Sequence, residues 1–300
     1  MIHIYKKINP ILFDVSLRDG LQGLSKYEQS SITLEAKEKI YNNICFLHEP
    51  TNIEIGSVVN PKILPVMANS LELFRDISLK NTKITKHTSY LPNLYMLAPN
   101  KKGYTLAINY GITNFSFLTS VSESFQKKNV NKTIEETKNE LIEIMHEINK
   151  ICNLYLPNEL KTKLYISCLN ECPIEGKINN NNVVNEIIYY SKNMNMHEFC
   201  LSDTCGTLLF TDFKYIIDKC IENGVDTQKL SLHLHISNNI DNIRNIVHYS
   251  LDNNIKKFDV SSIESGGCSV TMDKSKLKPN MSYELLYRLF DEYISKKEIK

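Results

Sequence analysis

The feature that most constrains this chain is a regular alternation between short β-branched runs and longer amphipathic stretches. Eight runs are predicted to be strands, at residues 11–17, 51–57, 82–88, 112–120, 162–169, 196–203, 229–237 and 255–263. The segments between them have helical periodicity, most clearly at 133–151 and 211–224. Strands that alternate with helices favour a parallel sheet, because each parallel connection needs a crossover.

The number of these units predicts a closed (β/α)8 barrel, the TIM fold. The chain has 300 residues and no break in composition, which fits one barrel domain over residues 1–300, since such barrels need about 250 residues. A doubly wound open sheet is the alternative, but the GxGxxG turn that often follows its first strand is absent. In a barrel, functional side chains gather at the C-terminal ends of the strands.

Composition indicates which classes of partner and which cellular compartment to expect. Lys and Arg number 35 against 34 Asp and Glu, so no basic excess points to nucleic acid or a membrane surface. The eight cysteines are scattered without a CxxC pair, which favours free thiols in a reducing compartment. No apolar run approaches a membrane span, and the N-terminus shows no signal peptide. We expect a cytoplasmic protein that acts on a small molecule.

The sequence HLH in the seventh run is the sharpest local motif. Residues i and i+2 of a strand point to one face, so His233 and His235 face the same way. They are either satisfied interior histidines or ligands of one metal ion. Asp19 follows the first run, and in a closed barrel the first strand lies two positions from the seventh. Two imidazoles and a carboxylate would suit Mg²⁺ or Mn²⁺, with room for substrate.

Other predicted strand ends also carry polar side chains, and several of these have both a structural and a functional interpretation. Asp14 and Ser16 of the first run are expected to face the barrel interior. Arg18 is either a salt-bridged surface residue or the holder of a substrate oxygen. Glu54, between two isoleucines, has either an interior ion-pair partner or a catalytic task. Cys268, after a Gly-Gly pair, is either inert or a reactive thiol on a flexible loop. The remaining polar strand ends are Tyr165, Ser167, Asp203, Thr204, Ser261 and Ser262.

Taken in order, these motifs resemble the 3-hydroxy-3-methylglutaryl-CoA lyase family, metal-dependent TIM-barrel lyases related to the pyruvate carboxyltransferase group. The resemblance covers nearly the whole chain. It rests on DVSLRDGLQ, IEIGSVVNPKILPVM, SESFQKKNVNKTIEET, YISCLNECPIEGKI, LSDTCGT, LHLH and FDVSSIESGGC. It implies cleavage of 3-hydroxy-3-methylglutaryl-CoA (HMG-CoA), or a close acyl-CoA, to acetyl-CoA and acetoacetate by retro-Claisen chemistry.

The resemblance also implies roles for individual residues. The implied ligands of Mg²⁺ or Mn²⁺ are Asp19, His233, His235 and Asn280. The implied catalytic residues are Arg18, Glu54 and Cys268. The implied substrate-binding residues are Arg18, Tyr165, Asp203 and Thr204. Arg18 would bind the substrate carbonyl and stabilise the enolate, and the loop at Ser25 and Lys26 corresponds to one that carries a lysine near the nucleotide.

The chain departs from the family pattern in three places, one of which is DTCGTLLF, where the usual later Gly-Thr-Pro is absent. Glu264 and Ser265 stand where the family has Gly-Leu, and Ser269 stands where it has Pro. Ile236 replaces the Asp that usually follows the second histidine. Two other functions stay open: a related enzyme that condenses acetyl-CoA with a keto acid, and a catalytically silent homologue that binds a metabolite or a partner, which the altered Cys268 loop suggests. A homodimer also stays open, because family members often dimerise.

Overall fold

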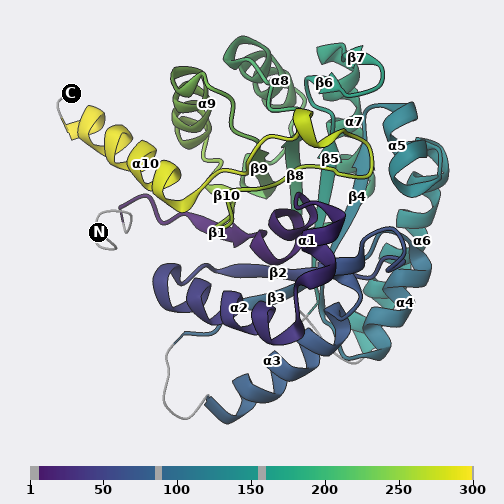
Figure 1. Ribbon diagram of the computed structural model, residues 1–300. Coiled ribbons are helices and arrows are strands. Elements are labelled where there is room, and N and C mark those ends of the chain that lie inside the picture. The colour runs from purple at the N-terminus through teal and green to yellow at the C-terminus, as the bar shows by residue number, and fades with distance from the viewer. Residues whose placement is uncertain (1–6, 85–89, 155–159, 299–300) are drawn as a thin grey trace.

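Eight parallel strands close into a barrel in the order β1-β10-β9-β8-β5-β4-β3-β2, so the chain has the predicted TIM fold (Figure 1). The computed structural model describes residues 7–84, 90–154 and 160–298. The barrel strands are β1 (Ile11–Asp14), β2 (Asn52–Ser57), β3 (Asn93–Leu97), β4 (Asn114–Ser120), β5 (Lys161–Ser167), β8 (Glu198–Asp203), β9 (Leu230–Leu234) and β10 (Lys257–Val260). As expected, the strand that carries the HLH motif lies one strand away from β1, with β10 between them.

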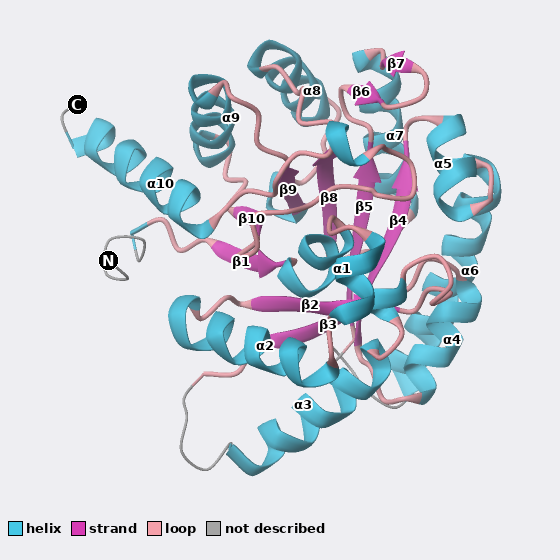
Figure 2. Cartoon of the chain, in the orientation of Figure 1, coloured by secondary structure: helices cyan, strands magenta, loops and turns pink. Residues whose placement is uncertain are grey.

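Helices form a layer around the outside of the barrel (Figure 2). The α-helices are α1 (Lys26–Ser31), α2 (Leu34–His48), α3 (Ser70–Ile84), α4 (Lys101–Asn109), α5 (Glu123–Val130), α6 (Ile134–Leu154), α7 (Asn180–Asn193), α8 (Phe210–Glu222), α9 (Ile240–Asp252) and α10 (Tyr283–Glu298). Short turns of other helix types are η2 (Ser16–Gly20), η3 (Pro65–Met67), η4 (Thr227–Lys229) and η5 (Lys274–Lys276), and β6 (Glu171–Cys172) pairs with β7 (Gly176–Lys177) as a hairpin after β5.

The local sequence explains why the helices begin and pack where they do. The backbone N–H of Glu136 donates to Thr133 Oγ1 at 3.0 Å and the backbone N–H of Thr133 donates to Glu136 Oε2 at 2.7 Å, a capping box that starts α6 near the predicted residue. In α8, the apolar side chains of Phe213, Ile216 and Ile217 recur at helical spacing and are fully buried. Such stripes hold the helices against the barrel, because burial of each large apolar side chain contributes about 1.5–3 kcal/mol.

The third strand is not where the sequence predicts it. Residues 82–84 of the predicted strand 82–88 belong to α3, and residues 85–88 lie outside the described residues. The barrel instead takes Asn93–Leu97, whose last four residues are buried. This run is poor in β-branched residues, so propensity favoured the wrong segment. Burial on both faces of a parallel strand outweighed that propensity.

The first run also differs from its predicted form. β1 ends at Asp14, and the π-helical turn η2 then carries Arg18 and Asp19. Phe13, not Asp14, faces the barrel interior, because the Lys163 ammonium lies 3.5 Å from the centroid of the Phe13 ring. The expectation that Asp14 faces the interior was therefore wrong. Its carboxylate points to the helix layer and accepts a 2.8 Å hydrogen bond from the Tyr283 hydroxyl of α10.

Candidate active site

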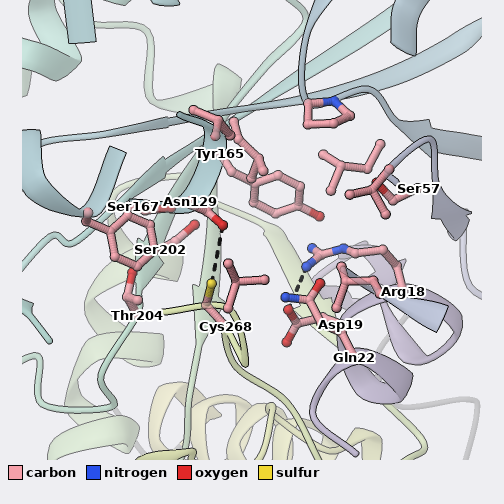
Figure 3. A pocket seen from close by; sticks show the side chains of 18 of the residues that line it. Arg18, Asp19, Gln22, Ser57, Asn129, Tyr165, Ser167, Ser202, Thr204 and Cys268 are labelled. Atoms are coloured by element: carbon pink, nitrogen blue, oxygen red, sulfur yellow. Dashed lines mark hydrogen bonds and ion pairs between the residues drawn. The ribbon is translucent and has the colours of Figure 1, made fainter. Parts of the chain in front are cut away.

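A pocket at the C-terminal ends of the strands contains seven of the predicted site residues (Figure 3). They are Arg18, Asp19, Tyr165, Thr204, His233, His235 and Cys268. Apolar side chains such as Ile63, Leu97 and Val270 complete the wall. Three other predicted residues, Glu54, Asp203 and Asn280, do not line the pocket. Glu54 and Asn280 form hydrogen bonds with residues that do, Arg18 and Asp19.

Arg18 stands between two carboxylates. Its Nε donates to Glu54 Oε2 at 2.5 Å, and its Nη1 donates to Asp19 Oδ1 at 2.5 Å. Tyr165 donates to the same Glu54 oxygen at 3.2 Å, and the Arg18 guanidinium lies 5.1 Å from the centroid of the Tyr165 ring. Although burial favours the neutral form, Glu54 and Asp19 hold the pKa of Arg18 well above its ordinary value. Glu54 therefore holds the charged Arg18 side chain in the pocket, but its own side chain is buried and does not line the pocket.

Asp19, His233 and His235 form a candidate metal site. One ligand atom from each lies within 4.8 Å of the others, and all three residues are buried. Burial would raise the pKa of Asp19, but the Arg18 guanidinium, the two neighbouring histidines and the Gly267 N–H together outweigh it, so the pKa falls far below its usual range. Burial, together with the neighbouring His233, lowers the pKa of His235 to about 4. An ionised carboxylate and a neutral imidazole are the forms that bind metal ions.

The Nε2 atoms of His233 and His235 point toward the same place in the candidate metal site. His233 Nδ1 lies 3.1 Å from Asp259 Oδ2, and His235 Nδ1 lies 3.1 Å from the carbonyl oxygen of Lys278. Both partners are acceptors, so each Nδ1 carries the proton and each Nε2 keeps a free lone pair. The two Nε2 atoms are only 3.2 Å apart. Two lone pairs at that distance repel unless a proton or a cation lies between them or beside them.

Asn280 completes this cluster from the far end of the chain. An isolated bridge pairs Asn280 with His235, which places its amide next to the histidines. Its Nδ2 donates to Asp19 Oδ2 at 2.9 Å, whereas its buried Oδ1 has no hydrogen-bond donor among the described residues. A Cβ atom at Gly266 would lie 2.4 Å from that amide nitrogen, so only glycine fits there. These contacts hold Asn280 beside Asp19 and His235 with its amide oxygen available as a ligand.

Cys268 lies on the segment that links β10 to α10, which passes over the end of the barrel toward α5 (Figure 1). Its sulfur lies 3.4 Å from Asn129 Oδ1, which accepts from the thiol (Figure 3). Burial raises the pKa of the Cys268 thiol. The group is therefore a protonated thiol, suited to giving a proton and not to attacking as a thiolate. The adjacent Gly267 N–H donates to Asp19 Oδ2 at 2.9 Å, which ties this loop to the candidate metal site.

Asp203 and Thr204 have different surroundings from each other. The Asp203 carboxylate accepts backbone N–H groups of Thr207 and Leu208 at 3.1 and 3.0 Å, and burial raises its pKa to about 6. Asp203 therefore shapes the turn after β8 and does not line the pocket. Thr204 does line it, and its hydroxyl accepts the Cys168 backbone N–H at 2.8 Å.

Two buried charged residues were missed by the sequence analysis. Asp259 on β10 contacts His233, and Lys163 on β5 forms an ion pair with Asp259. Both are interior residues, 3% and 0% exposed. The available signal was a charged residue inside each predicted strand, at KFDV and TKLYIS. Interior polarity in a barrel is recognisable only after the inward face is known.

Fold and site together define a TIM-barrel protein with a candidate divalent-metal site at the C-terminal mouth of the barrel. Residues 9–240 match the model of the HMGL-like family. The chain belongs to the HMGL-like family and, by that kinship, is a carbon–carbon lyase.

Individual relatives agree with this placement. A 3-hydroxy-3-isohexenylglutaryl-CoA/hydroxy-methylglutaryl-CoA lyase of Pseudomonas aeruginosa is 27% identical over 89% of this chain and 80% of its own length. The mitochondrial hydroxymethylglutaryl-CoA lyase of Macaca fascicularis is 30% identical over 75% of this chain, which spans 62% of that relative. An HMG-CoA lyase structure from Brucella melitensis superposes with a TM-score of 0.76 at 25% identity, over 94% of this chain and 90% of the other.

A further solved structure of a similar protein contains bound ligands. It is an HMG-CoA lyase from Acinetobacter baumannii in complex with coenzyme A and 3-methylmalate, with a TM-score of 0.76 at 23% identity over 95% of this chain and 84% of the other. At that identity the likeness shows the shared fold.

None of the helices in the described ranges combines the length and the apolarity needed to cross a bilayer.

Proposed function

We propose that this protein is a metal-dependent lyase that cleaves HMG-CoA, or a close acyl-CoA, to acetyl-CoA and acetoacetate. The observation that carries the proposal is the pair of histidine Nε2 atoms, 3.2 Å apart, that both face the Asp19 carboxylate. The unpartnered Oδ1 of Asn280 supplies a fourth donor beside them. Two imidazole nitrogens and two oxygens suit Mn²⁺ well and Mg²⁺ adequately.

The cation, when bound by these four residues, would act as a Lewis acid toward the hydroxyl and carbonyl oxygens of the substrate. Arg18 would donate from its free N–H groups to the thioester oxygen, where negative charge develops as the C–C bond breaks. A general base would accept the proton of the tertiary hydroxyl, the oxygen would become the ketone of acetoacetate, and the electrons of the broken C–C bond would leave as the enolate of acetyl-CoA. The Cys268 thiol, kept protonated by burial, would then supply a proton to the enolate carbon.

An acyl-CoA substrate is supported by a second hollow beside the pocket. The two share Ile63, Leu64 and Val270, so they adjoin. Lys26, Lys62 and Lys274 line the second hollow and would provide cations for the phosphate groups of coenzyme A. Lys26 lies in the loop where the family resemblance places a lysine near the nucleotide.

The direct test is to supply HMG-CoA with Mg²⁺ or Mn²⁺ and to measure acetoacetate. We expect product from the wild-type protein, and loss of product in His233→Ala, which removes one proposed ligand. Free 3-hydroxy-3-methylglutarate, which lacks the thioester, serves as the substrate control and should not be cleaved. No acetoacetate above the His233→Ala background would overturn the assignment and favour a silent homologue.

A further inference from the structure

A buried ion pair inside the barrel has no place in the mechanism above. Lys163 and Asp259 are 0% and 3% exposed, and they come from strands on different sides of the barrel. Such a pair is costly to desolvate, and an apolar pair of similar size is often no less stable. A contribution to stability therefore does not explain why the chain places it there.

The surroundings of the pair fix its geometry on every side. Lys163 Nζ contacts Asp259 Oδ1, lies 2.9 Å from Glu198 Oε1, and lies 3.5 Å from the centroid of the Phe13 ring. Lys163 therefore leaves the second carboxylate oxygen, Oδ2, free to accept elsewhere. That oxygen lies 3.1 Å from His233 Nδ1.

The two histidines of the candidate metal site are oriented by different devices. His235 Nδ1 donates to a backbone carbonyl at Lys278, in the segment that leads to Asn280. The orientation of His235 thus depends on the position of that segment. His233 instead depends on a side-chain carboxylate anchored inside the barrel, away from the loops.

We propose that Asp259, held in place by Lys163, is a positioning residue that presents the bare Nε2 of His233 to the metal ion. This inference rests on the proposed metal-dependent function. The carboxylate holds the proton on Nδ1 and fixes the plane of the imidazole ring. Outer partners of this kind typically change metal affinity or activity by about 10–100-fold.

The test compares Asp259→Leu with the double variant K163M/D259L. The single variant removes the acceptor and deprives Lys163 of its main partner, so reduced folding stability is expected as well. The double variant replaces both charges of the pair with apolar side chains of similar size, which should recover part of the melting temperature. Recovery is partial because Glu198 loses its contact with Lys163 and keeps only Lys257, 3.8 Å away. Ser231→Ala is the matched control, because Ser231 is buried on β9 two residues before His233.

Two readouts separate positioning from packing. Nitrogen-15 histidine NMR of the metal-free wild type, well above the ordinary histidine pKa, should show His233 protonated on Nδ1. Without Asp259, the protonation should shift toward Nε2. Calorimetric titration with Mn²⁺ should show affinity about 10–100-fold weaker in both Asp259 variants and unchanged in Ser231→Ala.

The outcomes are distinguishable. A folded double variant that binds Mn²⁺ as tightly as the wild type, or a wild-type His233 protonated on Nε2, overturns this inference alone. A wild type that binds neither Mn²⁺ nor Mg²⁺ overturns the proposed metal-dependent function and the inference with it.

Discussion

Among single residues, Arg18 has the most constrained position in the pocket. Glu54 and Asp19 each hold one of its nitrogens, and the Tyr165 ring packs against the guanidinium. Figure 3 shows the head group pointing into the pocket. This arrangement suits a planar, forked cation, because a guanidinium that bridges two carboxylates keeps several of its five N–H donors for a substrate, whereas an ammonium would keep one of three.

The conservative change Arg18→Lys should therefore be severe. We expect kcat for cleavage of HMG-CoA to fall by about 100–1,000-fold, because a donor to the developing negative charge is lost. Steady-state kinetics measure this, and circular dichroism with Mn²⁺ titration controls for folding and for Asp19. A variant within threefold of the wild type would remove Arg18 from the chemistry.

At the scale of elements, β1 and α10 are joined by one buried carboxylate. Asp14 accepts from the Ser16 backbone N–H at 2.8 Å and from the Tyr283 hydroxyl at 2.8 Å. Burial raises the pKa of Asp14 to about 7 despite these hydrogen bonds. The barrel thus closes with a group that is protonated in the folded chain under conditions where it is ionised in the unfolded chain.

The consequence is a pH-dependent stability that Asp14→Asn should lack. The pKa of Asp14 is about 7 in the folded state, against 3.8 for an ordinary aspartate such as that of the unfolded chain. Its contribution is therefore full below the lower value and is lost as pH rises through about 7. Between these limits, the wild type should lose up to about 4 kcal/mol of unfolding free energy relative to the variant. Urea denaturation at pH 5 and pH 8 measures the difference, and equal differences at both values would contradict the raised pKa.

For the whole molecule, the candidate metal site joins parts of the chain that are far apart in sequence. Asp19 follows β1, His233 and His235 lie at the end of β9, and Asn280 precedes α10. A bound cation would link the first strand to the last helix at the barrel mouth. The folded state alone brings these ligands together, so binding should favour folding.

Chelation followed by addition of metal tests this linkage. Protein stripped with EDTA should gain melting temperature on addition of Mn²⁺, with about 2.7 kcal/mol of stabilisation at a concentration one hundred times Kd. Differential scanning fluorimetry measures the gain. His235→Ala should lose most of it, and an equal gain in that variant would place the cation elsewhere.

The sequence by itself determined the alternation of elements, the closed barrel and the order of the site motifs along the chain. Period-two and period-3.6 patterns are local, so they are visible without coordinates. HLH already implied that His233 and His235 share a face, and both are buried at the mouth.

Only the tertiary structure decided the third strand, the inward face of β1, and the partners behind the site. β-branched residues favoured 82–88, but burial selected Asn93–Leu97. Asp14 was expected inside, yet Phe13 takes the inward face and Asp14 accepts a hydrogen bond from Tyr283 in the helix layer. Lys163 and Asp259 meet across the barrel although 96 residues separate them. Contacts of this kind depend on closure of the sheet, and no local pattern in the chain encodes which distant strand will lie opposite.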